Sequence, residues 1–382
     1  MKFSIVIPTY NNKILLKNTL EALNNQTGYC ASDYEVIVVD DGSSDSTEEY
    51  IRGINRNYNL KYYYLERCEN SCRSRTRNHG LKNAEGSIVA FIDSDIIVGS
   101  DYLHELNRCF SVNEDIFVLG NRLMLDESVS YEDVANGRIF EKHHFDAEKY
   151  HMLEFRHFLY NVSSFNAKTI MCPWIQTYSC NFAAPKKWLD IIGGFDENFK
   201  EWGMEDVEIG YSLYKHGVNM IINSKLEVLH QYHGPRNDLI IERKKVRGYE
   251  KNIDYFIEKH PEALKMTPRI AYKFLKGETS TNKVLMEIPI KKVELELRDK
   301  GELPHLKREM EKLIYLKDIK PILYDYVEDT DIDIWVQLLK SKINFIRYYP
   351  MSKRINVEKM MDYIDNEKKL QKIRDESEML IV

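Results

Sequence analysis

Two carboxylates spaced i, i+2, Asp93 and Asp95, follow an apolar run at 87–92. A short apolar run rich in β-branched and aromatic residues predicts a buried strand that is covered on both faces. If this strand continues to Asp95, both carboxylates project to the same side and Ser94 points away. Open α/β sheets bind ligands at the carboxyl ends of their strands, where two carboxylates can hold a divalent cation and, through it, phosphates. The alternative is that the aspartates are turn or helix-capping residues, since glycine and serine follow at 99–100.

A second pair of carboxylates, Glu205 and Asp206, opens an amphipathic pattern that predicts a helix ending near Gly217. Both residues fall in the first turn of this helix, where unpaired backbone N–H groups favour a carboxylate over a carboxylic acid. A carboxylate that stays ionised at neutral pH can act as a general base. The alternative is that these acidic residues only compensate the helix dipole.

Histidines provide the remaining candidate ligands. His230 and His233 follow the last expected strand, at 226–229. An earlier group has a spacing that fits no compact set of metal ligands, and we interpret its members as surface or packing residues: His143, His144, His151 and His157.

The elements that must position these residues alternate between strand and helix over residues 1–110, which predicts a parallel sheet in an α/β fold. Strands are expected at 3–7, 34–39, 60–65 and 87–92, and helices at 13–26, after the serines at 43–46, and at 73–83. Three of these strands end in polar residues, at 8–10, 40–41 and 93–95. Because parallel strands end at one rim of the sheet, this coincidence favours a binding site over turn chemistry alone.

The composition sets the class of protein. The chain has 382 residues, which allows two or three domains, and its net charge of −6 with both signs interspersed argues against a nucleic-acid partner. No apolar stretch is long enough for a transmembrane helix, and the first apolar run is too short for a signal peptide. The six cysteines are scattered, which favours a reducing cytoplasm. Peripheral attachment to the inner face of the membrane is the alternative location.

Three regions are expected: a catalytic domain at 1–240, a linker helix at 241–266 and a helical accessory region at 267–382. The last region is poor in glycine and rich in Lys and Glu, and its apolar residues recur at helical spacing. It could pack on the catalytic domain, form a homo-oligomer or bind an acceptor. A further amphipathic helix is expected at 147–160.

The motifs resemble those of a known family. The segments IVIPTYN (5–11), VVDDGS (38–43) and DSD (93–95) resemble the nucleotide-sugar half of family 2 glycosyltransferases with the GT-A fold. The segments GGFD (193–196) and WGMED (202–206) are similar to the acceptor half shared by galactosyltransferases and chondroitin-type polymerases. The resemblance covers about residues 2–235 and implies a Rossmann-like, mostly parallel sheet.

The resemblance also implies how a donor would bind. Pro8, Thr9 and Tyr10 would line the base pocket, with Tyr10 packed on a pyrimidine and Asp40 accepting a hydrogen bond from its ring N–H. A site built on such a bond discriminates between bases, so a UDP-sugar is the expected donor. Arg77 would lie near the diphosphate, with Arg75 as a helper.

The same comparison implies a metal site next to the donor. The segment Asp93-Ser94-Asp95 would contact the donor, with Asp93 at the ribose or sugar and Asp95 on the metal. His230 matches the family's late histidine ligand, and His233 is the fallback. Mixed oxygen and imidazole ligands suit Mn²⁺, with Mg²⁺ as the alternative.

For the acceptor half, the resemblance implies an inverting transfer in which Asp206 is the general base and Glu205 holds the acceptor. Trp202, Gly203 and Met204 would contact the acceptor, and Met204 replaces the family's usual glycine. A related retaining family has Glu-Asn where this chain has Glu-Asp, so the aspartate favours inversion.

Two other functions compete with this one. The chain could be a non-catalytic module that binds a nucleotide sugar or glycan on the same scaffold. A nucleotidyltransferase would share the metal and the carboxylates, but no glycine-rich phosphate loop with a lysine follows the first strand. The donor sugar stays open, and so does the acceptor, which could be a glycan, a lipid-linked glycan, a small molecule or a peptide side chain.

Overall fold

The computed structural model describes residues 2–143, 156, 160, 167, 172–234 and 239–263. Every helix and strand named below belongs to one compact unit, formed by residues 1–144 and 172–264. The expected accessory region at 267–382 lies outside the described residues, as do most of the helix expected at 147–160 and the histidines at 144, 151 and 157. In the described part, no helix is both long enough and apolar enough to cross a membrane.

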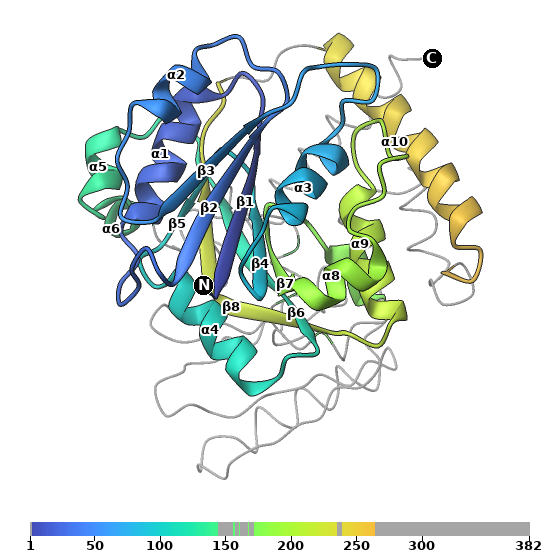
Figure 1. Cartoon of the computed structure of the whole chain (residues 1–382). Helices are drawn as coiled ribbons and strands as arrows, with labels where there is room; N and C mark the ends of the chain where they lie inside the picture. The colour runs from blue at the N-terminus through green and yellow to red at the C-terminus, as the bar shows by residue number, and fades with distance from the viewer. Residues whose placement is uncertain are drawn as a thin grey trace, which may run out of the picture. The chain divides into compact units, whose positions relative to one another are not determined.

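The core of this unit is a mixed sheet of eight strands (Figure 1). The strands are β1 (Phe3–Thr9), β2 (Tyr34–Asp40), β3 (Asn59–Tyr64), β4 (Ile88–Ile92), β5 (Ile96–Val98), β6 (Ile116–Met124), β7 (Asn181–Pro185) and β8 (Asn219–His230). Their order is β3-β2-β1-β4-β7-β6-β8-β5. The first four strands pair in parallel, β7 and β5 pair antiparallel to their neighbours, and β6 and β8 pair in parallel. The expected α/β class with a largely parallel sheet is confirmed.

Helices connect the strands and cover the sheet. They are α1 (Lys13–Asn24), α2 (Thr47–Arg52), α3 (Arg73–Lys82), α4 (Tyr102–Val112), α5 (Tyr131–Ala135), α6 (Ile139–Lys142), α8 (Lys186–Ile192), α9 (Glu205–Lys215) and α10 (Leu239–Lys259), with a 3₁₀ turn η3 (Pro173–Gln176). Helix α3 packs on β1 and β2, and α1 packs on β5. Figure 1 shows α1 and α2 on one side of the first strands and α3 on the other.

The strand order reverses next to β1. The chain runs outward from β1 through β2 to β3 and then returns by way of α3 to β4, on the other side of β1. Because such crossovers are right-handed, the return places α3 on the opposite face from α1 and α2. The loops after β1 and β4 therefore diverge at a switch point, which is where sheets of this kind bind ligands.

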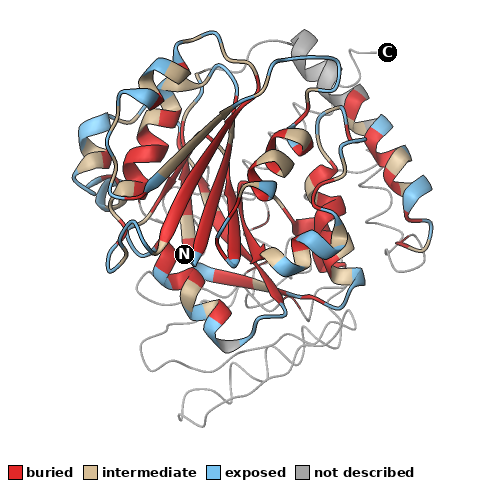
Figure 2. Ribbon diagram, in the orientation of Figure 1, coloured by how far each residue is buried: buried red, intermediate tan, exposed pale blue. Residues whose placement is uncertain are grey.

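The inner strands are apolar because helices cover them on both faces. Every residue of β2 and β4 is buried, and so is almost all of β1 (Figure 2). Helix α3 approaches β1 so closely that a Cβ on Gly80 would lie 2.3 Å from a methyl group of Val6. A glycine is therefore required where this helix crosses the strand.

The structure differs from the sequence-based expectation in three places. β4 ends at Ile92, so the alternation of side chains along a strand does not apply to Asp93 and Asp95. β8 begins at Asn219, seven residues before the strand expected at 226–229. The strands β5, β6 and β7 were not predicted, because short apolar runs do not distinguish strand from helix.

Candidate active site

Three loops at the carboxyl ends of β1, β2 and β4 are joined by hydrogen bonds. The backbone N–H of Asn11 donates to Ser43 Oγ at 2.8 Å, and the Asn11 side chain accepts from the N–H of Ser44 at 2.8 Å. The side chain of Asn12 donates to Ser94 Oγ at 2.8 Å. Asn11 adopts φ +48°, a left-handed conformation that asparagine tolerates better than most residues. The loop after β1 therefore fixes both neighbouring loops.

The expected base-pocket residues lie at this junction. Asp40 is buried, and its carboxylate accepts from the N–H of Ser43 at 2.7 Å and from the Tyr62 hydroxyl at 2.9 Å. Burial and the bond to Asp40 raise the pKa of Tyr62, so this phenol stays a hydrogen-bond donor. Thr9 is buried next to Asp40 in the sheet register, and its hydroxyl has no hydrogen-bond partner among the described residues. The hydroxyl of Thr9 therefore has unused hydrogen-bonding capacity next to Asp40.

Tyr10 is half exposed, and the guanidinium of Arg67 lies 3.9 Å from the centre of its ring. Arg67 also pairs with Asp41 at 2.8 Å, and Arg75 lies 3.7 Å from the other oxygen of that carboxylate. One face of the Tyr10 ring is therefore covered by a cation. Arg67 could not be predicted as a site residue, because only the tertiary structure brings it to Tyr10.

Arg77 joins the two halves of the site. Its side chain is 3% exposed, and its guanidinium lies 3.1 Å from Asp93, 3.4 Å from Glu205 and 3.7 Å from Asp206. Burial lowers the pKa of Arg77, but the charges of the three carboxylates outweigh burial and leave the pKa above its usual range. Arg77 is thus surrounded by carboxylates, one from the end of β4 and two from the start of α9.

The two carboxylates of α9 have different environments. Burial, followed by the charge of Asp206, raises the pKa of Glu205 in spite of the nearby Arg77. One oxygen of Glu205, Oε2, is buried and accepts no hydrogen bond from the described residues. Asp206 is more open, with a side chain 23% exposed. A pair of carboxyl groups in unlike environments can divide acid and base roles between them.

The turn before α9 carries the expected acceptor residues. Trp202 is 47% exposed, whereas the side chain of Met204 is 2% exposed and packs inside the protein. Gly203 has φ +85° and Met204 has φ +72°, so two successive residues are left-handed. Glycine adopts this conformation freely, whereas methionine does so at a cost.

A carboxylate and two imidazoles meet at the end of β8. Asp95 Oδ2 lies 2.9 Å from Nε2 of His233 and 3.7 Å from Nε2 of His230. One potential ligand atom from each residue lies within 4.8 Å of the others. The antiparallel pairing of Ile96 with His230 brings this cluster together, and the side chain of Gln231 anchors the segment to α1.

The cluster fits a divalent cation. Oδ1 of Asp95 is buried and accepts no hydrogen bond from the described residues, so it can serve as a ligand. Burial lowers the pKa of His230, which keeps this imidazole neutral, as metal binding requires. A ligand set of one carboxylate oxygen and two imidazole nitrogens suits Mn²⁺ better than Ca²⁺. His233 lies nearer to Asp95 than His230 does.

The structure therefore gathers the expected residues in two groups. Asp93, Glu205 and Asp206 meet at Arg77, whereas Asp95 faces His230 and His233. Ser94 is buried and bonded to Asn12. Asn11 and Asn12 were not predicted as site residues. Their position directly after a strand that ends at the expected binding rim was a signal for that role.

Models of two protein families match consecutive parts of the chain. The family "Glycosyl transferase family 2" matches residues 4–170, and the "N-terminal domain of galactosyltransferase" matches residues 156–234. The first match spans the loops after β1, β2 and β4, and the second spans the Glu205-Asp206 pair and the histidines.

Curated relatives agree with these matches. A validoxylamine A glucosyltransferase of Streptomyces hygroscopicus is 28% identical over 283 residues, which are 68% of this chain and 61% of the relative. Chondroitin synthase of Escherichia coli is 33% identical over 237 residues, 56% of this chain and 32% of the relative. The chain thus spans about three-fifths of the length of the first relative and a third of the second.

A solved structure shares the fold. The crystal structure of S. aureus TarS 1-349 superposes with a TM-score of 0.51 at 17% sequence identity, covering 83% of this chain and 82% of that one. The sheet of this chain is accordingly that of the GT-A glycosyltransferases. Both parts of the site are thus matched in order: residues 4–170 match the family 2 glycosyltransferases, and residues 156–234 match the N-terminal domain of galactosyltransferase.

Proposed function

We propose that this chain is an inverting, metal-dependent glycosyltransferase that moves a sugar from a UDP-sugar to an acceptor hydroxyl. The observation that carries the proposal is the position of Arg77, which contacts Asp93 from the donor half and Glu205 and Asp206 from the acceptor half. Carboxylates more than 110 positions apart in the chain therefore lie around one guanidinium. A binding module would need only the donor half of this arrangement.

Asp206 is the proposed general base. It lies in the first turn of α9, and it is more exposed than Glu205, so an acceptor hydroxyl can reach it. Asp206 would take the proton of that hydroxyl as its oxygen attacks the anomeric carbon on the face opposite the departing diphosphate. One displacement of this kind inverts the configuration. Glu205, whose pKa is raised, would hold the acceptor through hydrogen bonds.

Asp95, His230 and His233 would hold the cation. Bound there, Mn²⁺ or Mg²⁺ would stabilise the negative charge that develops on the leaving nucleoside diphosphate. Arg77 is enclosed by carboxylates, so we assign it to the positioning of Asp93 and the two α9 carboxylates, and we leave contact with the diphosphate to Arg75.

The donor base would bind between the loops after β1 and β2. Thr9, with its unpartnered hydroxyl, and Asp40 supply polar groups, and Tyr10 backed by Arg67 supplies an aromatic face. The names of the relatives, a glucosyltransferase and a chondroitin synthase, support a sugar donor. A glycan is the proposed acceptor, with a lipid-linked glycan, a small molecule and a peptide side chain as the alternatives.

The test is Asp206→Asn. We expect this variant to lose at least about a thousandfold in transfer, because the proton acceptor is removed. It should still bind UDP with Mn²⁺, as measured by thermal shift. Asp190→Asn on α8 is the matched control and should transfer like wild type, because Asp190 is 53% exposed and its ion pair among the described residues is with Lys186. Transfer by Asp206→Asn within tenfold of wild type would contradict the assignment of the base.

A further inference from the structure

A tyrosine from outside the two matched regions lies against the acceptor turn. Tyr249 belongs to α10, and a Cβ on Gly203 would come within 2.6 Å of its Cδ2 atom. The rings of Tyr249 and Trp202 have centroids 5.8 Å apart at an angle of 51°. From the same helix, the buried side chain of Asn252 donates to the carbonyl oxygen of Gly203 at 2.6 Å. Helix α10 thus contacts this turn at three points.

The turn requires such support. Gly203 and Met204 are both left-handed, and a left-handed methionine costs free energy that the surroundings must offset. Trp202 is exposed over nearly half of its surface, so its ring is held only from the side of Tyr249 among the described aromatic contacts. Without Tyr249, the indole ring and the turn would have other conformations available.

Glu205 lies near enough to Tyr249 for its charge to act on the phenol. Burial, and then the charge of Glu205, raise the pKa of Tyr249 to about 12, so the phenol keeps its proton at neutral pH. Glu205 Oε2 is buried without a hydrogen-bond partner among the described residues. A buried carboxylate oxygen needs a hydrogen bond, and a hydroxyl group of the acceptor substrate can donate it.

We propose that Tyr249 is the positioning residue of the acceptor subsite. It holds Trp202 and the turn at Gly203 so that the six-membered polyol ring of an acceptor, a pyranose or a cyclitol, lies on the exposed indole face with a hydroxyl at Glu205. The apolar face of such a ring complements an aromatic surface, and its hydroxyls complement the adjacent carboxylates. This inference rests on the proposed function and deepens it by naming the chemistry of the acceptor.

The experiment uses the full chain with Mn²⁺, with UDP-glucose and UDP-GlcNAc as donors. The acceptor probes are methyl β-D-glucopyranoside, methyl β-D-galactopyranoside and N-acetylglucosamine. Tyr249→Ala should raise the KM for the acceptor about tenfold and leave the KM for the donor within twofold, because an aromatic contact is worth about a factor of ten. Tyr249→Phe keeps the ring and should restore the acceptor KM to within about threefold of wild type.

Tyr255→Ala is the matched control. It removes an aromatic ring from the same helix, where Tyr255 packs on Phe199 and bonds to Asp196, away from the turn. It should lower the melting temperature and leave the acceptor KM within twofold. A parallel rise in donor and acceptor KM in Tyr249→Ala would make Tyr249 a residue of general stability and would overturn the proposal.

A double-mutant cycle with Trp202→Ala adds a second test. If Tyr249 acts by holding the indole, the double variant should bind the acceptor no more weakly than Trp202→Ala alone. If the losses of acceptor binding in the two single variants multiply in the double variant, Tyr249 does not act through the indole. The acceptor KM is the readout for all four proteins of the cycle, because Trp202→Ala removes the indole that would report binding by fluorescence. In wild type, tryptophan fluorescence with UDP and Mn²⁺ bound reports acceptor binding directly, and a Trp202→Phe variant assigns that signal to Trp202.

Different results would contradict the acceptor inference and the proposed function. If wild type binds UDP but its fluorescence and its rate of UDP release respond to none of the three sugars, the acceptor inference is wrong and the donor function stands. If UDP with Mn²⁺ produces no thermal shift, the proposed function itself is wrong.

Discussion

At the scale of single residues, the site is defined by how its charges are compensated. One buried guanidinium, Arg77, faces three carboxylates, so the group has an excess of negative charge wherever Glu205 is ionised. The raised pKa of Glu205 relieves part of that excess. A buried arginine without its carboxylates, or these carboxylates without Arg77, would be strongly destabilising. The group therefore acts as one unit.

Met204 shows two residue-scale effects that oppose each other. Met204→Gly relieves a left-handed φ, worth about 1–2 kcal/mol, but removes a side chain that is 2% exposed, worth about 2–5 kcal/mol. We expect the loss of the buried side chain to outweigh the relief of backbone strain, so that the free energy of unfolding falls by about 2 kcal/mol in urea denaturation. Met204→Leu, which keeps the volume, should lose less than about 1.5 kcal/mol. Stability of Met204→Gly at or above wild type would show that backbone strain dominates.

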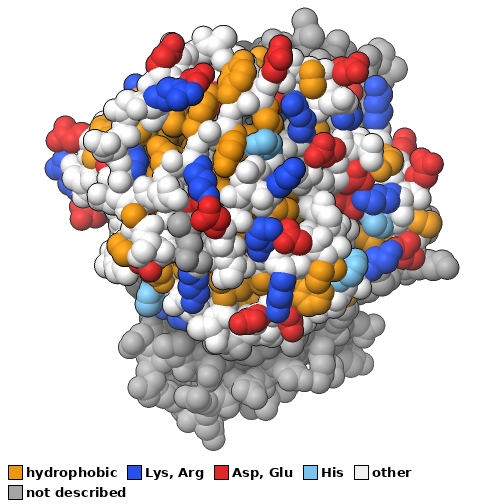
Figure 3. Space-filling model, in the orientation of Figure 1, with side chains coloured by type: hydrophobic (Ala, Val, Ile, Leu, Met, Phe, Trp, Pro, Cys, Tyr) orange, Lys and Arg blue, Asp and Glu red, His pale blue; other side chains and the backbone are white. Residues whose placement is uncertain are grey.

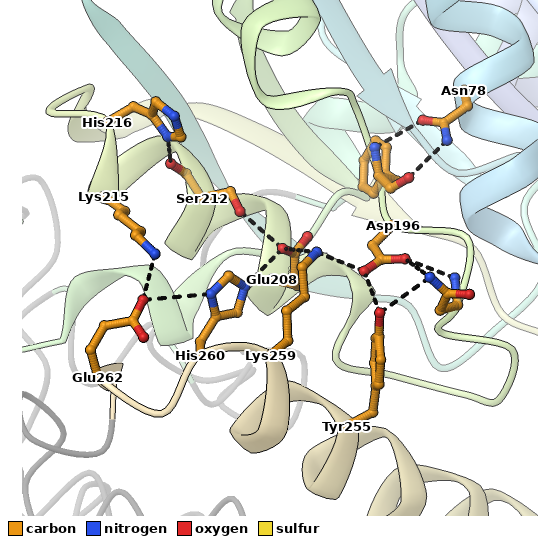
Figure 4. Close-up of polar contacts among 12 residues, drawn as sticks. Asn78, Asp196, Glu208, Ser212, Lys215, His216, Tyr255, Lys259, His260 and Glu262 are labelled. Carbon is orange, nitrogen blue, oxygen red and sulfur yellow. Dashed lines mark hydrogen bonds and ion pairs between the residues drawn. The ribbon is translucent and has the colours of Figure 1, made fainter.

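At the scale of elements, α9 and α10 are joined by a polar network that Figure 4 shows. Glu208, one turn after Glu205, accepts from Lys259 at 2.8 Å and lies 3.0 Å from Nε2 of His260. Lys259 also pairs with Asp196 at 2.6 Å. These contacts fix α10 against the helix that carries the proposed base, and they lie about ten residues beyond Tyr249. The linker helix expected at 241–266 overlaps α10, which these bonds join to α9.

The network predicts an acid-sensitive helix contact. Burial would raise the pKa of Glu208, but bonds from His260 and Lys259 outweigh it and the net pKa is lowered. A lowered carboxyl pKa stabilises the fold above the unfolded value of about 4.5, and this stability is lost as the pH falls through the folded value. Glu208→Gln should therefore cost about 3 kcal/mol at pH 7 and less at pH 3, by urea denaturation at each pH.

The matched control for this prediction is Glu48→Gln. Glu48 is 43% exposed and pairs with Arg52 on α2, so its loss should cost less than about 1 kcal/mol. An equal cost for both variants at pH 7, or a cost of Glu208→Gln that does not depend on pH, would argue against a buried ionic contact between α9 and α10.

At the scale of the compact unit, the sheet order decides where the parts of the site meet. The reversal between β1 and β4 makes the loops after these strands diverge, and the β5–β8 pairing brings the histidines to Asp95. Charges of both signs are interspersed over the face shown in Figure 3, in agreement with the small net charge of −6. Specific recognition of a negative diphosphate would thus rest on local groups and a bound cation.

Metal and nucleotide should therefore stabilise the folded unit together. UDP at a hundredfold its Kd adds about 2.7 kcal/mol, or a rise of several degrees in melting temperature. We expect this rise with Mn²⁺ and its loss with EDTA. His233→Ala should lose most of the metal-dependent part, whereas His216→Ala, at the exposed end of α9, should keep it. The same shift in His233→Ala as in wild type would exclude His233 as a ligand.

Several features were predictable from local sequence. The first strands and helices, the start of α9 at Glu205 and its end before Gly217 follow from apolar periodicity and turn residues. The position of Asp40 and Asp93 at strand ends follows as well. These features depend on contacts between residues that are near in the chain, and periodicity records such contacts.

The tertiary structure alone decided the partners of the charged groups. Arg77 was expected at a diphosphate and lies among carboxylates, and Asp93 and Asp95, two residues apart, face different partners because β4 ends before them. Tyr249 meets Gly203 only because α10 returns to α9. Such contacts join residues tens to hundreds of positions apart, and they depend on strand order and helix packing, which no local pattern of residues encodes.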